Sequence, residues 1–364
     1  MAIQPIYVPI LKGKEGEFAA LEELTPDIRG RIMPLIEVPE IPYDYANQRR
    51  AKSLDQHVAG VAERLRRCFP DGPLYLDLPW FGERDFLEDG RLALEAVLAD
   101  CAKLGVNAVP VVSRTSPAAY INAAANHAAT NPTGVCVRLV VDDFKEEVDL
   151  DLDLHRVVNA LGGMRTIPTD LVIDLEDVGQ DVSRAILIAR SVFSMLPKEY
   201  PWRRMILAAA SFPQDLSDVD AATTITLPRH EWNLWNALQR RPKQLPSAAL
   251  VFGDYTISHP IPKELDPRTM RMSANIRYTT KNDWLIVKGR NVRQYGFDQY
   301  FDLCDELIER DEYSGREYSW GDKYIEACAK QIKGPGNATT WRKVGVNHHL
   351  TLVTREIANL LPGS

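Results

Sequence analysis

The sequence lacks the short motifs that identify several large enzyme classes. It has no Gly-x-x-x-x-Gly-Lys-Ser/Thr phosphate loop, no Gly-x-Gly-x-x-Gly turn, no Gly-x-Ser-x-Gly elbow and no zinc-ligand spacing. These absences argue against a nucleoside triphosphatase, a nicotinamide-dependent enzyme and a serine hydrolase. The chain contains five cysteines, and none of them forms a Cys-x-x-Cys pair. We therefore expect buried free thiols in a reducing cytosol.

The sequence also lacks long apolar runs and an excess of basic residues. No run approaches the roughly 20 apolar residues that cross a bilayer, and the first residues show no secretory signal. We therefore expect a cytoplasmic protein without membrane contact. The formal net charge of −7 argues against a general nucleic-acid-binding protein. Residues 263–364 carry 16 Lys and Arg against 14 Asp and Glu, which leaves a local basic groove open there.

What the sequence does contain is a series of short apolar runs that end in a polar residue. One phrase occurs three times, as Val-Pro-Ile-Leu-Lys at 8–12, Met-Pro-Leu-Ile-Glu at 33–37 and Val-Pro-Val-Val-Ser at 109–113. Strands that are buried on both faces have near-continuous Val, Ile and Leu runs of this kind. Eight strands are predicted, with starts near Tyr7, Ile32, Leu74, Ala108, Val135, Leu171, Met205 and Ala249.

Helix-like stretches separate these strands. Residues 92–104 and 182–196 place apolar side chains at three- and four-residue spacing, and Gly105 and Pro197 end the two stretches. Eight alternating strands and helices predict an α/β fold, a (β/α)8 TIM-like barrel. An open α/β sheet is the alternative, because a closed barrel has no edge strand that tolerates proline. In a barrel we expect Pro9, Pro34 and Pro110 at strand starts or bulges.

The pattern changes after residue 258. Residues 259–262 have the composition of a linker, 274–278 and 284–288 are predicted strands, and 297–309, 319–333 and 350–361 are predicted helices. The Ser-x-x-Asp spacing of Ser319 and Asp322 is typical of a capped helix start. The predicted organisation is a barrel over 1–258 and a C-terminal α+β appendage over 259–364 that packs on the barrel.

Polar residues at the strand ends outline a candidate site, because the chemistry of such barrels lies at the C-terminal ends of the strands. Asp174 and Glu176 are two residues apart in one predicted strand, so we expect both carboxylates to point into the barrel mouth. The other charged residues at or beside strand ends are Lys12, Glu37, Asp77, Arg114, Arg138 and Asp254.

This mixture of charges suits metal-dependent phosphoester chemistry. The predicted catalytic carboxylates are Glu37, Asp77, Asp174 and Glu176. The last two are also the predicted ligands of Mg²⁺ or Mn²⁺, which prefer oxygen donors. The cations predicted to hold a phosphate are Lys12, Arg114 and Arg138. The alternative is that these charges pair with one another and only orient the loops of the mouth.

Aromatic and histidine residues add further candidates. Tyr255, which follows Asp254, is predicted to cover a ligand as an aromatic lid, with a packed tyrosine in a turn as the alternative. Trp80 either stacks on a ring-bearing ligand or plugs a loop. His348 is predicted to act as a general acid or base, with a capping or core histidine as the alternative. His348 and His349 point about 100° apart on a helix, which suits a shared metal ion poorly.

Longer strings connect the chain to a known family. They are Tyr-Val-Pro-Ile-Leu-Lys-Gly-Lys at 7–14, Pro-Leu-Ile-Glu-Val at 34–38, Phe-Gly-Asp-Tyr at 252–255, Ile-Arg-Tyr at 276–278, Ser-Trp-Gly-Asp at 319–322, Trp-Arg at 341–342 and Asn-His-His at 347–349. From residue 7 to about 353 the chain resembles the beta family proteins, which are named after a phage beta protein and found in phages and bacterial genomes. The resemblance implies a setting of phage–host conflict. It adds weight to Glu37 and His348, and to the ligand-binding candidates Asp254, Trp320, Asp322, Trp341 and Asn347.

Two functional hypotheses follow. The first is a barrel that binds a phosphorylated or nucleotide-like ligand, or a nucleic-acid end, at its C-terminal mouth and hydrolyses it with Mg²⁺ or Mn²⁺. The second is a non-catalytic sensor or scaffold that binds a phage or host protein. An enzyme needs a concave pocket with convergent charges, whereas a scaffold needs an exposed apolar patch.

Overall fold

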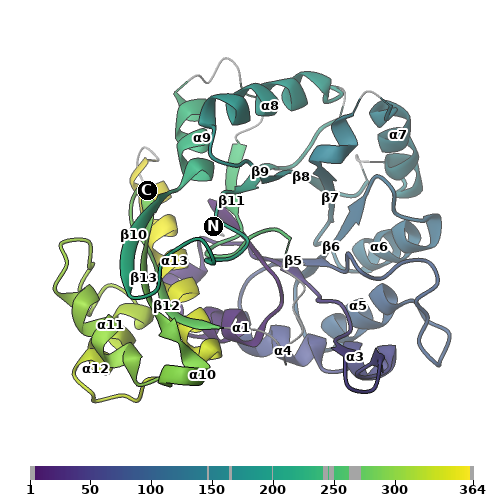
Figure 1. Ribbon diagram of the computed structural model, residues 1–364. Coiled ribbons are helices and arrows are strands. Elements are labelled where there is room, and N and C mark those ends of the chain that lie inside the picture. Colours follow the sequence, from purple (N-terminus) through teal and green to yellow (C-terminus); the bar gives the residue numbers. More distant parts are fainter. Residues whose placement is uncertain are drawn as a thin grey trace.

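Eight parallel strands close into a barrel in the order β1-β11-β9-β8-β7-β6-β5-β2 (Figure 1). The computed structural model describes residues 5–145, 147–163, 166–198, 200–240, 245, 250–261 and 272–360. The barrel strands are β1 (Tyr7–Leu11), β2 (Leu35–Glu37), β5 (Leu74–Asp77), β6 (Ala108–Ser113), β7 (Val135–Val140), β8 (Thr169–Asp177), β9 (Met205–Ala210) and β11 (Leu250–Asp254). The predicted barrel is confirmed, and the open sheet is not what the chain forms. Three predicted element ends, at Ala249, Pro262 and Leu361, lie outside the described residues.

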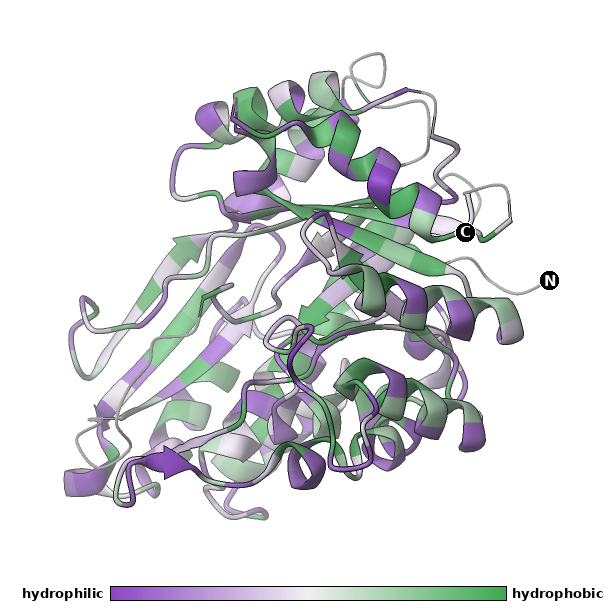
Figure 2. Ribbon diagram, turned by 90° about the vertical axis from the view of Figure 1, so that its right-hand side faces the viewer, coloured by the Kyte–Doolittle hydropathy of each residue, from purple (hydrophilic) through white to green (hydrophobic). Residues whose placement is uncertain are grey.

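Helices follow most of these strands and surround the barrel (Figure 1). They are α1 (Glu15–Glu22), α2 (Pro26–Arg29), α3 (Leu54–Val58), α4 (Val61–Cys68), α5 (Ala93–Lys103), α6 (Ala118–Thr130), the 3-10 turn η1 (Val141–Phe144), α7 (Leu150–Ala160), α8 (Val182–Met195) and α9 (His230–Gln239). Hydrophobic and hydrophilic residues alternate along them (Figure 2), because one face packs on the strands. Ser53, Asp149 and Asp181 each cap a helix by accepting a backbone N–H of its first turn. A short hairpin, β3 (Tyr43–Asp44) and β4 (Arg49–Arg50), follows β2. All five cysteines are buried and free.

The prolines of the repeated phrase lie where the staggered strands change partners. β1 pairs with β11 up to Pro9 and with β2 from Ile10 onward. β6 likewise pairs with β5 up to Pro110 and with β7 from Val111. Proline has no backbone N–H to donate, and this loss breaks fewer hydrogen bonds at the end of a strand pairing than in its middle. Pro34 directly precedes β2 as predicted, whereas Pro9 and Pro110 lie inside regular strands, so that the expectation of a strand start or bulge was wrong for them.

A second, antiparallel sheet has the order β10-β13-β12 and lies beside the barrel (Figure 1). Its strands are β10 (Thr223–Pro228), β12 (Ser273–Thr279) and β13 (Asp283–Asn291). β10 lies between β9 and β11 in the sequence, yet it pairs with β13. The helices α10 (Val292–Tyr295), α11 (Gln299–Ile308), α12 (Trp320–Ala329) and α13 (Ala338–Leu360) follow β13. Ser319 caps α12 as predicted. The division of the chain at residue 258 stays a prediction.

The last helix, α13, connects the second sheet to the barrel. It begins at Ala338, well before the predicted start at residue 350, because the Asn337 side chain caps the Thr340 N–H. α13 packs against α1, α12, β12 and β1, so it takes the place of the helix that follows the eighth barrel strand. A Cβ on Gly345 would lie 2.6 Å from Ile257 Cδ1, and one on Gly16 would lie 2.7 Å from the Thr339 carbonyl oxygen. Both glycines therefore permit this close packing. Among the described residues, no helix combines the length and hydrophobicity that a membrane crossing requires.

A buried polar cluster lies between the barrel and the second sheet. Arg229 and Glu231, both almost fully buried, are joined by a bond of 3.2 Å from Nε to Oε1. The Nη2 atom of Arg229 lies 3.8 Å from Asp254 Oδ2 and has no hydrogen-bond partner among the described residues. Ser211 donates its hydroxyl proton to Glu231 at 2.8 Å. Burial raises the pKa of Glu231 from its ordinary 4.5 to about 7, and the nearby Asp254 carboxylate contributes to the rise.

We expect Glu231→Gln to flatten the pH dependence of stability between about pH 4.5 and 7. The folded protein holds the Glu231 proton more tightly than the unfolded chain, so this stabilisation is complete below pH 4.5 and is lost as the pH rises through about 7. The loss amounts to at most about 3 kcal/mol. Urea unfolding across this range measures it, with Glu317→Gln on the surface as the control. Parallel pH profiles for the wild type and Glu231→Gln would contradict the prediction.

Candidate functional site

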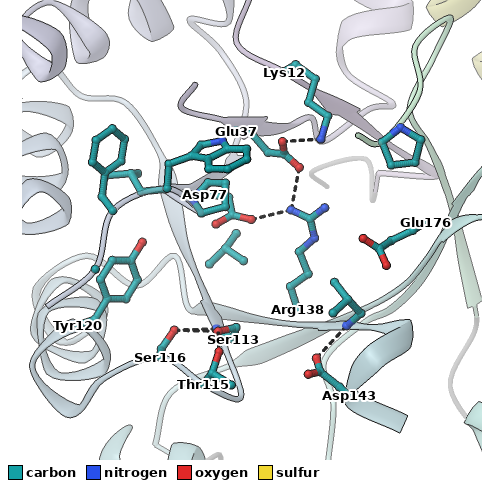
Figure 3. A pocket seen from close by; sticks show the side chains of 18 of the residues that line it. Lys12, Glu37, Asp77, Ser113, Thr115, Ser116, Tyr120, Arg138, Asp143 and Glu176 are labelled. Atoms are coloured by element: carbon teal, nitrogen blue, oxygen red, sulfur yellow. Dashed lines mark hydrogen bonds and ion pairs between the residues drawn. The ribbon is translucent and has the colours of Figure 1, made fainter. Parts of the chain in front are cut away.

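A cavity of about 530 Å³ opens at the C-terminal ends of the barrel strands (Figure 3). Its floor is charged and its walls are aromatic and hydroxyl-bearing. The charged lining residues are Lys12, Glu37, Asp77, Arg138, Asp143 and Glu176. The aromatic and hydroxyl-bearing ones are Trp80, Phe81, Tyr120, Tyr255, Ser113, Thr115 and Ser116. The cavity lies where the sequence predicts the site.

Arg138 is the centre of the floor. It projects from β7, and its Nη1 donates to Glu37 Oε1 at 2.9 Å and to Asp77 Oδ2 at 2.7 Å (Figure 3). Its Nη2 donates to Asp174 Oδ2 at 2.6 Å and to the Tyr255 hydroxyl at 2.7 Å. Tyr255 in turn donates to Asp174 at 2.5 Å. Tyr255 is therefore a buried part of the floor and not an exposed lid.

Lys12 completes the floor from the end of β1. Its ammonium lies 2.6 Å from Glu37 Oε2 and 4.7 Å from the centre of the Tyr255 ring. Burial alone would raise the pKa of Glu37, but Arg138 and Lys12 bring it below its ordinary value. Both cations of the floor are thus engaged by carboxylates, which is the ion pairing that the sequence left open as an alternative.

Asp77 differs from Glu37 in its ionisation. Burial raises the pKa of Asp77 to about 6, although the charge of Arg138 opposes the rise. The buried Asp77 carboxylate shares Arg138 with the neighbouring Glu37, whose negative charge adds to the shift. Asp77 therefore exchanges its proton close to neutral pH, which is a useful property for acid–base chemistry.

Glu176 is the free carboxylate of the mouth. Its backbone has φ of 52°, and the pairing of β8 with β9 is irregular between Asp174 and Asp177. This irregularity breaks the simple alternation that the sequence predicts, although both carboxylates still reach the mouth region. Among the described residues, the Glu176 carboxylate makes no hydrogen bond or ion pair, and it faces the cavity (Figure 3). Burial and the charge of Asp174 raise the pKa of Glu176.

Hydroxyl groups line the rim beside the start of α6. The Ser116 hydroxyl accepts the Ser113 N–H at 2.9 Å, and the Ser113 hydroxyl lies 3.2 Å from that of Thr115. No side chain caps α6, which begins after Pro117. Sequence reasoning missed Thr115, Ser116 and Tyr120, although the string Ser-Arg-Thr-Ser-Pro at 113–117 follows a barrel strand and so marked a loop of the mouth.

Arg114 points away from the cavity. Its guanidinium pairs with Asp143 through Nε and with Asp153 through Nη1 at 2.9 Å, and it is not part of the cavity lining. Two acidic partners on η1 and α7 hold it there. The predicted phosphate clamp of Arg114 and Arg138 is therefore not assembled, because Arg114 is held outside the cavity lining by Asp143 and Asp153 while Arg138 is bound by carboxylates.

The donor set of the mouth does not fit Mg²⁺ or Mn²⁺. No group of three or more His, Cys, Asp or Glu side chains in the described part of the chain could hold a metal ion. Both oxygens of Asp174 are engaged, Oδ2 by Arg138 and Tyr255 and Oδ1 by the Glu176 N–H. The guanidinium of Arg138 lies among the carboxylates where a cation would have to bind, so their charge is already neutralised.

Asp254 faces the helices and not the mouth. It precedes Tyr255, and successive residues of a strand point to opposite sides. Its Oδ1 accepts the Tyr7 hydroxyl at 2.6 Å, and its Oδ2 lies 2.9 Å from His349 Nε2. Asp254 is buried and absent from the cavity lining. It joins β11 to β1 and α13.

His348 is a buried residue of α13. Its Nδ1 lies 2.8 Å from Asp322 Oδ2, and its Nε2 lies 2.8 Å from the Thr279 carbonyl oxygen. Both ring nitrogens therefore face oxygen atoms, which fixes the orientation of the ring. Burial alone would raise the pKa of Asp322, but His348 brings it below its ordinary value. The pair does not contact the mouth cavity, and this placement matches the core-histidine alternative.

The remaining candidates also belong to the unit around α12 and α13. Asn347 accepts the Gly321 N–H at 3.0 Å and donates to the Ala20 carbonyl at 3.1 Å, which joins α12 to α1. Trp320 and Trp341 stack on tyrosines of the same unit. None of these three lines the mouth cavity. Sequence could not separate them from the mouth, because the family strings mark positions without showing where they meet.

Comparison with solved structures returns other barrels at low similarity. 3-Hexulose-6-phosphate synthase has 13% sequence identity and a TM-score of 0.33, over 69% of this chain and 90% of its own. A type I 3-dehydroquinate dehydratase from Clostridium difficile has 13% identity and a TM-score of 0.37, over 71% and 88%. A 2,3-dimethylmalate lyase of the PEP mutase/isocitrate lyase superfamily has 10% identity and a TM-score of 0.37, over 73% and 88%. At these values the likenesses carry no argument about activity.

Sequence comparison gives a more specific result. No curated protein matches the chain. The Beta protein family model, however, matches residues 7–355, which is nearly the whole chain and includes the barrel, the second sheet and most of α13. The chain therefore belongs to the Beta protein family.

Proposed function

We propose that the barrel mouth binds a small phosphorylated ligand that carries a ring, as a nucleotide does. The observation that carries this proposal is the 530 Å³ cavity, in which a hydroxyl-rich rim, aromatic walls and one free carboxylate converge. Fold alone would be a weak reason, since barrels support many functions. A cavity of this size with a few convergent polar groups is typical of a small-molecule site.

The phosphate is placed at the rim and not on the floor. The hydroxyls of Ser113, Thr115 and Ser116 line the rim, where they contact one another at 3.2 Å and can rotate to donate to a phosphate instead. The uncapped first turn of α6 adds the positive end of a 13-residue helix. The floor cations Lys12 and Arg138 are already paired. This arrangement replaces the phosphate clamp that the sequence suggested.

The ring is placed between the aromatic walls. Trp80 is 53% exposed at the cavity, which is unusual for a large aromatic side chain and leaves one face open for stacking. Glu176 then lies free to accept hydrogen bonds from amino or hydroxyl groups of the ligand. A 5′-phosphorylated nucleic-acid end presents the same groups as a free nucleotide.

A thermal-shift titration tests this proposal. A nucleoside 5′-monophosphate is expected to raise the melting temperature more than the nucleoside or inorganic phosphate alone, because only the monophosphate engages both walls. Ser116→Ala should weaken binding about tenfold, the value of one lost hydrogen bond to a charged group. Ser194→Ala, on the outer helix α8, is the control. Equal responses to all three compounds, or none, would reject the proposal.

Catalysis is a second candidate, favoured by the free Glu176. In metal-free phosphoester hydrolysis, water attacks phosphorus and Glu176 takes a proton from that water. The bond from phosphorus to the leaving oxygen breaks, and this oxygen takes up a proton from solvent to give the free alcohol. We expect Glu176→Gln to lower phosphate release at least 100-fold. Binding should fall much less, because the glutamine oxygen still accepts a hydrogen bond and the rim and aromatic walls are unchanged. Glu317→Gln on the surface is the control. Binding without turnover in the wild type would favour a non-catalytic sensor in the phage–host setting that the family resemblance implies.

A further inference from the structure

A second cavity, of about 240 Å³, lies where β12 of the second sheet meets the stretch after β11 of the barrel. β12, the stretch after β11 and the start of α13 form its walls. The lining residues that matter here are Ser273, Asn275, Arg277, Tyr300, Trp341 and Arg342. None of them lines the mouth cavity. This cavity is separate from the ligand site proposed at the barrel mouth.

Two arginines give this cavity its charge. Arg277 is half-buried, and among the described residues it has no carboxylate partner. In the part of the chain that the structure describes, its donors reach two neutral acceptors, Asn275 Oδ1 at 3.2 Å and the Ile257 carbonyl oxygen at 2.8 Å. The face of its guanidinium lies 4.8 Å from the centre of the Phe212 ring. Arginines this deep in a protein are usually paired with an anion.

Arg342 adds a second positive charge with little compensation. Among the described residues, its one carboxylate partner is Glu17, whose Oε1 lies 3.7 Å from Nη1. Burial raises the pKa of Glu17, and Glu17 also accepts the Lys14 N–H at 3.0 Å. Burial together with the like charge of Arg342 lowers the pKa of Arg277 to about 10. The two guanidinium groups therefore repel each other across the cavity. An anion bound between them would attract both and offset this repulsion.

The surroundings favour an anion that carries an organic group. Ala338, the first residue of the 23-residue helix α13, lines the cavity, so the positive end of that helix faces it. Tyr300 and Trp341, stacked with ring centres 4.1 Å apart, form an aromatic wall. The volume corresponds to about eight water molecules, which is more than a bare phosphate fills.

We propose that Arg277 and Arg342 form a second binding site, for a small oxyanion attached to a ring or short apolar group. The oxyanion lies between the two guanidiniums, with Asn275 and Ser273 as neutral donors. The organic group lies against Trp341 and Tyr300. Trp341 thus acquires the ligand-binding role that the sequence suggested, but at a site outside the barrel mouth. Phosphate and carboxylate share this chemistry, and the probes below distinguish them.

The test compares two neighbouring charge changes on α13. Arg342→Gln removes a cavity guanidinium, whereas Lys343→Gln removes the same charge one residue later, where the side chain pairs with Glu23 outside the cavity. The probes are phenyl phosphate, benzoate and inorganic phosphate, titrated calorimetrically into the full chain. We expect phenyl phosphate or benzoate to bind the wild type and Lys343→Gln equally. Arg342→Gln should weaken that binding at least tenfold.

Further outcomes separate this site from the mouth. Ser116→Ala, which alters only the mouth, should leave the Arg342-dependent binding unchanged. If Ser116→Ala abolishes binding and Arg342→Gln does not, the anion binds at the mouth and the second site is rejected. Equal binding to Arg342→Gln and the wild type also rejects it. Because Arg342 is 30% exposed, the variant should fold, and without ligand we expect it to melt no lower than Lys343→Gln. A lower melting temperature would mean that Arg342 is structural, and would overturn the inference.

Discussion

Replacing Arg138 with methionine is expected to lower the free energy of unfolding by about 3–5 kcal/mol. The methionine fills much of the arginine volume, so the loss comes mainly from charge. Glu37, Asp77 and Asp174 all direct an oxygen at this guanidinium from within 3 Å, and all three are buried. Without Arg138, these carboxylates would face one another with no central cation. Urea unfolding of the wild type and the variant measures the effect.

The pH dependence distinguishes this cause from a simple packing defect. As the pH falls, protonation neutralises the carboxylates of the variant, beginning with Asp77, whose pKa is about 6 even beside Arg138, so the difference between variant and wild type should shrink. Arg67→Met is the control, since Arg67 is 60% exposed and forms surface ion pairs with Glu22 and Glu15. It should lose no more than about 1 kcal/mol. A loss for Arg138→Met that is small or independent of pH would show that the floor does not depend on its central charge.

Replacing His348 with glutamine is expected to cost a similar amount, about 3–5 kcal/mol, although His348 does not line the mouth. His348 and Asp322 are both fully buried, and the ring also lies 3.9 Å from the centre of Tyr278. Glutamine is neutral, so it cannot exert the charge effect by which His348 lowers the pKa of Asp322. The measurement is again the free energy of unfolding, together with ligand binding at the mouth, which should not change in the folded variant.

The pH dependence of stability in acid distinguishes the wild type from the His348→Gln variant. His348 depresses the pKa of Asp322, so the pair contributes stability above pH 3.8 that is lost as the pH falls through the lower folded value. The variant should lack this acid-dependent contribution. His155→Gln is the control, because His155 is 51% exposed and lies 3.8 Å from an exposed Asp151. Loss of mouth binding without loss of stability would instead restore a functional role for His348.

Several strings of the family form packing contacts between the last helices of this chain. Gly321 approaches α13 so closely that a Cβ would lie 2.5 Å from the Val344 carbonyl oxygen, and Gly345 lies as close to Ile257. Asn347 joins α12 to α1, and the His348–Asp322 pair holds α13 to α12. The resemblance pointed to the right family, but its strings at 319–322 and 347–349 describe how the last helices pack.

The sequence alone determined the barrel and the location of its mouth. Strands buried on both faces require continuous apolar runs, and polar residues at their ends can only lie where those strands stop, so Lys12, Glu37 and Asp77 were identifiable. The capped start of α12 and the strands β12 and β13 were equally local signals. In each case the information lies within a few consecutive residues.

Only the tertiary structure decided which charges meet. Arg138 pairs with Glu37 across 101 positions and with Tyr255 across 117, and no local pattern contains such partnerships. Local patterns also did not show that Asp254 contacts His349 or that the backbone is irregular at Glu176. They likewise did not show that Arg277, which has no carboxylate partner among the described residues, lies near Arg342. The charge of a side chain depends on burial and on neighbours that folding brings together. Local sequence can therefore predict where a site lies, but only the tertiary structure decides the ionisation and hydrogen bonding of its residues.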